Sequence, residues 1–146
     1  MDYRAAPSQP QPDRSVLVVG LSGHVYAIDR ATGELRWHND LSGGGLGHVA
    51  IAVGYGVVIA SAGGAAVFCI DYLGGETRWQ QPTHGRGRAT ILIEADQIVV
   101  AKGGHVDCFS PEGHRLWGQP LRGAGMGRAA LGYPGNVVQS DDPGSE

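Results

Sequence analysis

The sequence predicts an all-β fold in which one hairpin occurs three times. The stretch Val25–Trp37 (VYAIDRATGELRW) returns as Val67–Trp79 (VFCIDYLGGETRW) and, in a more divergent form, as Val106–Trp117 (VDCFSPEGHRLW). In each copy an alternating apolar run leads to a turn with Gly, and a Trp follows four residues after that Gly. Alternation followed by a Gly turn is typical of a β-hairpin. A repeat of about 40 residues that holds several short strands is typical of the four-stranded antiparallel blades of a β-propeller.

The composition fits one globular domain. The chain has 146 residues, of which 42% are hydrophobic and 17% charged, and this is enough to bury a core. Its 25 glycines have no three-residue period and cluster between apolar runs, as many tight turns require. A net charge of −3 gives no general case for nucleic acid, and the longest apolar runs are too short to span a bilayer. Because Met1–Arg14 shows no secretory signal, a cytoplasmic location is expected.

The chain divides into a tail, a repeat region and a second tail. Residues 1–14 are Pro-rich without an apolar period, which predicts a flexible linker, and residues 141–146 form an acidic end. Residues 15–140 carry the repeats. The strands expected there are Val16–Val19, His24–Asp29, Glu34–Asn39, Val49–Val53, Val57–Ser61, Ala66–Asp71, Glu76–Gln80, Ala89–Glu94, Ile98–Ala101, His105–Ser110, Arg115–Gln119, Arg128–Leu131 and Asn136–Ser140.

The order of these strands predicts three blades per chain. The chain supplies three strands, two sets of four, and then the inner strand Arg128–Leu131, so one blade is divided between the two ends. Three blades cannot close a ring and would leave apolar flanks in water. We therefore expect a closed, six-bladed homodimer in which Arg128–Leu131 of each chain completes the three-stranded blade of the other. Asn136–Ser140 is then an extra strand or an ordered tail. The alternative is a segment of a longer propeller that pairs with other chains.

The repeated hairpin resembles the β-propeller repeats of pyrroloquinoline-quinone (PQQ) dehydrogenases, whose blades end in a Gly-then-Trp pattern like that of Thr32–Trp37. The resemblance covers about residues 15–140. It implies that Trp37, Trp79 and Trp117 dock between neighbouring blades, and we expect all three to be buried. The third copy departs from the pattern in its turn, Ser110–Gly113. The same repeat serves enzymes, outer-membrane assembly scaffolds and sensors, so it implies a fold more than an activity.

A second repeated pattern, Gly-x-Gly-basic, lies between the blades. Its basic residues are His48, Arg88 and Arg128, each about 40 residues after the last. In a propeller this connection leads into the inner strand of the next blade, so the three side chains would ring the mouth of the central channel. Two interpretations stay open: an anion-binding site, or glycines that only permit a tight crossing beside solvated basic side chains. A nucleotide loop is disfavoured, because no helix follows any copy.

Few other residues suggest chemistry. Cys69 and Cys108 fall at the same place in their copies, where the first copy has Ala27, and are expected to be small buried residues. Asp29 and Asp71 precede their turns and are expected to accept hydrogen bonds from turn amides. None of the six His residues shows metal-ligand spacing, so neither a metal site nor a cofactor is expected.

The sequence therefore predicts a non-enzymatic binding or assembly module without catalytic residues. The expected partners are a second copy of the chain, another protein, or a small anion at the channel mouth, and neither nucleic acid nor a membrane. Two alternatives stay open. One is a remnant of a quinone-dependent oxidoreductase, which would need more blades and acidic calcium ligands. The other is a small lectin whose Trp residues stack on sugars.

Overall fold

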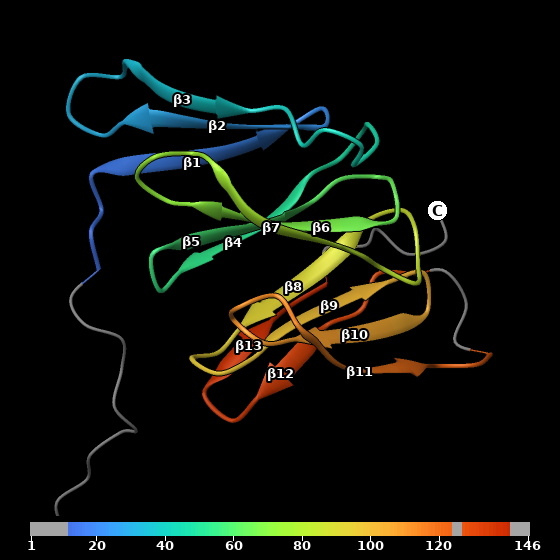
Figure 1. Ribbon diagram of the computed structural model, residues 1–146. Coiled ribbons are helices and arrows are strands. Elements are labelled where there is room, and N and C mark those ends of the chain that lie inside the picture. The colour runs from blue at the N-terminus through green and yellow to red at the C-terminus, as the bar shows by residue number, and fades with distance from the viewer. Residues whose placement is uncertain (1–11, 124–126, 141–146) are drawn as a thin grey trace, which may run out of the picture.

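A computed structural model describes residues 12–123 and 127–140, and these residues form thirteen strands joined by turns and loops (Figure 1). Residues 1–11 of the predicted tail 1–14, and the whole of the predicted tail 141–146, lie outside the described residues. The strands form four antiparallel sheets, which confirms the all-β prediction. Within this described part there is no helix of the length and apolarity that crossing a membrane requires.

Two of the sheets are complete blades of four strands. The second sheet consists of β4 (Ala50–Gly54), β5 (Val57–Ser61), β6 (Ala66–Asp71) and β7 (Thr77–Pro82), paired in that order. The third consists of β8 (Ala89–Ile93), β9 (Ile98–Lys102), β10 (His105–Phe109) and β11 (Arg115–Pro120), also paired in order. Each strand therefore pairs with its neighbour in sequence, as the predicted propeller blades require.

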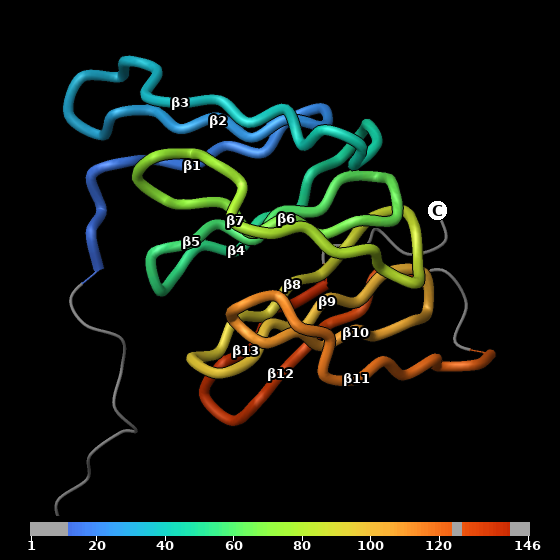
Figure 2. The backbone as a smooth tube through the Cα atoms, viewed as in Figure 1, coloured from blue at the N-terminus to red at the C-terminus, as the bar shows by residue number. Residues whose placement is uncertain are grey.

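The two end sheets are smaller. The first sheet has three strands, β1 (Val16–Leu21), β2 (His24–Asp29) and β3 (Leu35–Asn39). The fourth has two, β12 (Leu131–Tyr133) and β13 (Asn136–Val138). The three larger sheets follow one another through the molecule, and the hairpin β12–β13 lies against β8 (Figure 2).

The repeated hairpin has the same register in each copy. The residue pairs opposite each other are Ala27 and Trp37, Cys69 and Trp79, and Cys108 and Trp117. A register shift follows directly after each pair, so every copy carries an irregularity at the same place. Both cysteines are free and buried, as predicted. The local sequence repeat is therefore also a repeat of backbone pairing.

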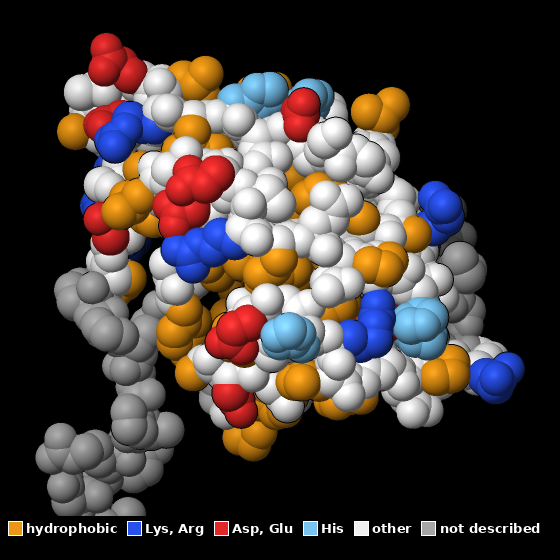
Figure 3. Space-filling view, in the orientation of Figure 1, with side chains coloured by type: hydrophobic (Ala, Val, Ile, Leu, Met, Phe, Trp, Pro, Cys, Tyr) orange, Lys and Arg blue, Asp and Glu red, His pale blue; other side chains and the backbone are white. Residues whose placement is uncertain are grey.

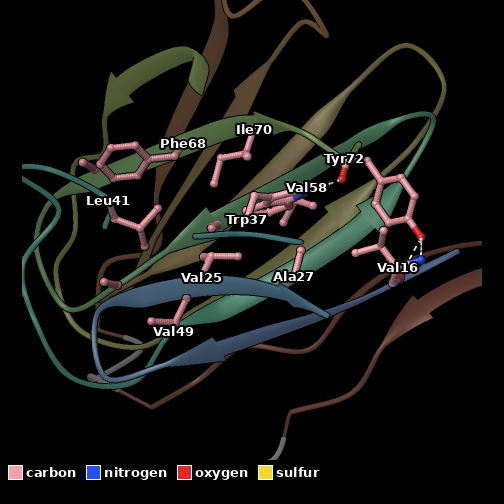
Figure 4. Packing of buried hydrophobic residues seen from close by; sticks show 13 residues of the cluster. Val16, Val25, Ala27, Trp37, Leu41, Val49, Val58, Phe68, Ile70 and Tyr72 are labelled. Atoms are coloured by element: carbon pink, nitrogen blue, oxygen red, sulfur yellow. Dashed lines mark hydrogen bonds between the residues drawn. The ribbon is translucent and has the colours of Figure 1, made fainter. Parts of the chain in front are cut away.

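The core lies between successive sheets. Between the first and second sheets, Val25, Ala27 and Trp37 pack against Val58 and Ile70 (Figure 4). A second cluster fills the space between the second and third sheets, with Ile59, Val67, Ile91, Val100 and Phe109 among its members. Strands β5 and β9 are buried at every residue because they have a sheet on each face, so their sequences are apolar runs without alternation.

The last part of the chain differs from the prediction. The expected inner strand Arg128–Leu131 was placed too early, because Leu131–Tyr133 forms the strand and Pro134–Gly135 the turn. Gly135 has a φ of 81°, which suits a tight hairpin, whereas Gly132 lies inside the strand. Asn136–Val138 is therefore not a leftover tail but the partner of β12. The described residues thus form thirteen strands, as many as the sequence predicted, and the last sheet holds two of them.

Candidate functional site

The three predicted basic residues directly precede or approach innermost strands. His48 and Arg88 stand just before β4 and β8, and both are exposed. Arg128 stands before β12 and is half-buried, with its Nη2 donating to the carbonyl of Ala89 at 3.1 Å. Partial burial of the ring, followed by the charges of Arg88 and Arg128, lowers the pKa of His48. The fold thus brings the charges of Arg88 and Arg128 within electrostatic reach of His48, and an anion site at these residues stays a prediction.

The glycines of these connections have a packing role as well. The carbonyl of Gly44 accepts from the amide of Gly64 at 2.9 Å, and that of Leu46 accepts from Gly63 at 2.9 Å. A Cβ on Gly45 would lie 2.5 Å from the Gly64 nitrogen. The first connection therefore packs closely against the turn between the middle strands of the second sheet, which only glycine permits, and Gly85 of the second connection lies equally close to Lys102; Gly125 and Met126 of the third lie outside the described residues. This packing favours the interpretation that the glycines permit a tight crossing, and it is also compatible with an anion site at the basic residues that follow them.

Trp37 lies between the first and second sheets. Its side chain is 9% exposed, and its Nε1 donates to the carbonyl of Tyr72 at 2.9 Å. The ring covers Gly75 so closely that a Cβ there would lie 2.5 Å from it. Two residues further along the same strand, Asn39 Nδ2 donates to the carbonyl of Gly75 at 3.0 Å. An indole and an amide of one sheet thus hold the turn of the next.

Trp79 repeats this arrangement between the second and third sheets. Its Nε1 donates to the carbonyl of Pro111 at 2.9 Å, and its ring lies 2.7 Å from where a Cβ of Gly113 would be. Gln81 Nε2 donates to the carbonyl of Gly113 at 2.7 Å. We call this arrangement the docking contact: a Trp and an amide side chain two residues later, bound to the carbonyls of the Gly turn of the next sheet.

The prediction that all three Trp residues are buried holds for Trp37 alone, because Trp79 is half-buried and Trp117 is exposed. Its side chain is 42% exposed. Trp117 shares a face of the third sheet with Cys108, and that face is covered by the hairpin β12–β13. The fourth sheet has no third or fourth strand among residues 127–140, so the Gly turn on which Trp117 would dock is lacking there. The docking role of the three Trp residues stays a prediction.

The Gly turns of the first and second sheets are held by their own aspartates, as predicted. Asp29 Oδ1 accepts from the amide of Thr32 at 3.0 Å, and Asp71 Oδ2 accepts from the amide of Gly74 at 2.8 Å. An Arg of the outer strand pairs with each carboxylate. The Thr32 amide does most to lower the pKa of Asp29, and the Arg side chain does most at Asp71. The shape of both turns is thus held by contacts within their own sheet.

The fold also assembles a polar cluster that the sequence pattern did not predict. Asp107 is 1% exposed and accepts from the His84 amide at 3.0 Å, while His84 Nδ1 lies 2.7 Å from its Oδ1. His105 Nε2 lies 3.6 Å from the same oxygen, and Arg115 forms an ion pair with it. Burial raises the pKa of Asp107, but the His84 hydrogen bonds and the Arg115 charge outweigh burial and leave the pKa below its usual value.

This cluster has the donor atoms of a metal site but already holds a cation. The ligand atoms of His84, His105 and Asp107 all lie within 4.8 Å of one another. However, the Arg115 guanidinium contacts the same carboxylate oxygen, so a metal ion there would face a positive charge. We therefore interpret the cluster as a structural support for a buried carboxylate. Sequence spacing could not reveal it, because His84 belongs to the loop after β7 and the others to β10.

Lys102 is a second buried charge that links neighbouring sheets. It is 3% exposed, and its Nζ donates to Ser61 Oγ at 2.8 Å and to the carbonyls of Ala62 and Gly64 at 2.9 and 2.5 Å. Burial lowers the pKa of Lys102 to about 8, and the charge of Arg86 acts in the same direction. Because its three donors are all used, Lys102 ties the third sheet to the turn after β5.

A large hollow lies beside the first sheet. It has a volume of about 1110 Å³ and is lined by Val16–Val18 of β1, by the Asp29–Gly33 turn and by the turn Val53–Gly56. β1 is an edge strand of its sheet, so one side of its backbone faces no strand of the described chain. The hollow and the free strand edge lie at the same end of the molecule, opposite to the fourth sheet.

Comparison with known proteins agrees with this architecture. A sequence model of the family described as outer membrane protein assembly factor BamB matches residues 4–140. The crystal structure of BamB from Moraxella catarrhalis is similar, with a TM-score of 0.63 and 26% identity over 73% of this chain and 34% of that chain. The present chain thus spans about a third of that BamB. A comparison with curated proteins found no match.

Two quinone-type enzymes share the fold. A europium-containing methanol dehydrogenase has a TM-score of 0.56 and 15% identity over 73% of this chain and 23% of that one. The quinohemoprotein alcohol dehydrogenase from Comamonas testosteroni has a TM-score of 0.55 and 21% identity, over 73% and 19%. The predicted resemblance to PQQ-type repeats is confirmed, and the chain belongs to the PQQ-like repeat family described as outer membrane protein assembly factor BamB.

Proposed function

We propose that this protein is a non-enzymatic assembly module that binds protein partners through the open ends of its stack of sheets. The observation that carries the proposal is the incomplete first sheet, whose edge strand β1 borders the large hollow. An unpaired strand edge presents backbone amides and carbonyls that an added strand can pair with. The same position in the second and third sheets is filled by β4 and β8, so a partner strand beside β1 would complete the first sheet in the same way.

The outer face of the first sheet supports this proposal. Leu17, Leu21 and Leu35 lie on the face turned away from the second sheet and are 59%, 59% and 62% exposed. Covering each of them would contribute on the order of 1 kcal/mol. Hydrophobic side chains also reach the surface around the β12–β13 end of the molecule (Figure 3). Apolar surface at both ends of the stack is therefore more stable when it is covered by further sheets than when it is exposed to water.

The family likeness supports an assembly role over a redox role. BamB is described as an outer membrane protein assembly factor, and the family model matches nearly the whole chain. The two dehydrogenases are less than 25% identical to this chain, and their likeness supports the fold alone. We therefore carry assembly of proteins, rather than oxidation of alcohols, over to this chain as the proposed activity.

Self-association is the simplest form of this assembly. In a closed homodimer, β12 of each chain would lie beside β1 of the other and complete a four-stranded sheet, giving six blades. Light scattering over a concentration series tests this, with a dimer mass expected at micromolar concentration. A monomer at all concentrations would contradict self-association.

Two further measurements test the alternative functions. Incubation with PQQ and calcium should give no cofactor-dependent dye reduction, and a glycan array should give no signal. A response in the first assay would favour an oxidoreductase, and a response in the second would favour a lectin.

A second proposed function is anion binding by His48, Arg88 and Arg128, because the three basic side chains stand at equivalent places before β4, β8 and β12 and the charges of both arginines reach His48. Phosphate or a polyanion should raise the melting temperature of the protein, and the gain should weaken with added salt. Arg88→Ala should remove most of this gain, whereas Arg36→Ala, in the first sheet, should keep it. A melting temperature that responds to no anion would leave only the tight-crossing role of these connections.

A further inference from the structure

The docking contact occurs twice within the chain and leaves one set of donors unused. Trp37 with Asn39 and Trp79 with Gln81 each bind the Gly turn of the following sheet. The third copy carries the same pair of residue types in β11. Its Trp117 is 42% exposed, and among the described residues its Gln119 reaches only the carbonyl of the adjacent Pro120, at 3.2 Å.

One receiving turn is likewise unused. The Gly turns of the second and third sheets are both covered by a Trp, and only the turn Asp29–Gly33 of the first sheet is not. A Cβ on Gly33 would meet no atom of the described residues within 4 Å, whereas one on Gly75 would lie 2.5 Å from the Trp37 ring. The turn is already in shape, because Asp29 accepts from Thr32 and the Gly33 amide donates to the Asp29 carbonyl at 2.9 Å.

Resting on the proposed assembly function, we propose that Trp117 and Gln119 of one chain dock onto the Asp29–Gly33 turn of a second copy. By analogy with the two internal contacts, the Trp117 indole donates to the carbonyl of Arg30 and the Gln119 amide to the carbonyl of Gly33. The donors and the turn lie at opposite ends of the stack, so neither can satisfy the other within one chain. In a two-fold dimer the contact is made twice.

Docking in this way requires β13 to move. By pairing order β12 corresponds to β4 and β8, while β13 corresponds to β5 and β9. β1 of a second copy corresponds to β5 and β9 as well, so it would occupy the position beside β12 that β13 occupies in the single chain. The hairpin β12–β13 has only three residue pairs, so little pairing is lost when β12 exchanges β13 for β1. The hairpin is thus a cap that competes with dimer formation.

The experiment measures the dissociation constant of the full-length dimer by sedimentation for four proteins. Trp117→Ala removes the docking ring, and Gly33→Asn fills the cradle with a residue that tolerates a positive φ. Both should weaken association at least about ten-fold, as loss of a central aromatic contact does. Leu116→Ala, which changes an exposed neighbour of Trp117, is the matched control and should bind like the wild type.

Mixing the two weakened variants gives the sharpest result. A heterodimer of Trp117→Ala with Gly33→Asn keeps one intact contact, since the Trp of the second protein faces the unaltered turn of the first. The mixture should therefore associate more tightly than either variant alone. Trp fluorescence should shift to the blue with increasing concentration in the wild type and much less in Trp117→Ala, because Trp37 and Trp79 already lie between sheets of their own chain.

A fourth variant tests the competition with β13. Val138 packs against the third sheet, so Val138→Asp should release the hairpin and tighten the dimer. A dimer that persists unchanged in both Trp117→Ala and Gly33→Asn would overturn the docking proposal while leaving the assembly function intact. A wild type and a Val138→Asp variant that both stay monomeric would overturn the docking and the self-association together.

Discussion

Trp37 and Trp117 occupy the same place in two copies of one hairpin, yet their surroundings differ. Each stands opposite a small residue, Ala27 or Cys108, and each is followed by an amide side chain two positions later. Trp37 is 9% exposed because a complete sheet follows it, whereas Trp117 is 42% exposed because only a two-stranded sheet does. The hairpin thus sets the direction of the Trp side chain, and the neighbouring sheet decides whether it is buried.

The largest expected effect is the loss of the buried Trp. Trp37→Ala should lower the free energy of unfolding by about 3–5 kcal/mol, since it removes a buried aromatic ring and a hydrogen bond. Trp117→Ala should cost less than about 1 kcal/mol in the monomer. Chemical denaturation at a concentration below self-association measures both values. Equal losses for the two variants would contradict the view that the neighbouring sheet makes the difference.

The same comparison shows what sequence reasoning could reach. The repeat, the strand ranges of the second and third sheets and the directions of Trp37 and Trp79 all follow from local alternation and Gly turns, which the sequence displays directly. The expected burial of Trp117 and the expected bounds of the strand Arg128–Leu131 were wrong, because each depends on how many strands the next sheet contains. That number is set by packing between segments rather than by a local pattern.

The candidate sites divide in the same way. His48, Arg88 and Arg128 were singled out by a repeated motif, and the fold brings their charges near one another. The cluster around Asp107 was missed, because the residue has no counterpart at a matching place in the other copies. It pairs with a loop residue, His84, across a distance in sequence that no motif spans. Repeats therefore revealed the shared features, and the unique buried charges needed the structure.

The second prediction compares a buried carboxylate with a surface one. Asp107→Asn should cost about 3 kcal/mol, because it leaves Arg115 and His84 around a neutral group in a buried place. Asp29→Asn should cost less than about 1 kcal/mol, since its ion pair is exposed to solvent. The lowered pKa of Asp107 also means that its contribution is present above the ordinary value of 3.8 and is lost as the pH falls below it. Acid titration of both variants by circular dichroism checks this, and equal acid midpoints would contradict it.

The third prediction concerns two glycines in equivalent turns. Gly75 and Gly33 have similar φ angles of 84° and 78°, so replacement by Ala strains both backbones by about 1 kcal/mol. Only at Gly75 would the new Cβ also collide with the Trp37 ring, which should raise the total to about 2–3 kcal/mol. Thermal melts of Gly75→Ala and Gly33→Ala at low concentration separate the cost of backbone strain from the cost of the collision with the Trp37 ring. A larger loss for Gly33→Ala than for Gly75→Ala would contradict the view that a Trp covers the turn at Gly75 and that none covers the turn at Gly33.

The smallest expected effect belongs to Lys102, whose equivalent in the second sheet, the last residue of β5, is Ser61. Because burial lowers the pKa of Lys102 to about 8, the unfolded chain binds more protons than the folded protein between pH 8 and the ordinary value of 10.5. Stability due to this group should therefore rise with pH across that window. The three hydrogen bonds of its ammonium favour the charged form and limit the rise in stability to about 1 kcal/mol.

The variant Lys102→Met has no titrating amine at this position and should lack the rise, while the other groups that titrate at alkaline pH are the same in both proteins. Urea unfolding of the pair at pH 7, 8.5 and 10 measures the difference. A gap between the two proteins that is constant over this range would show that Lys102 stays charged in the folded state, and that its hydrogen bonds to the turn after β5 fully offset its burial.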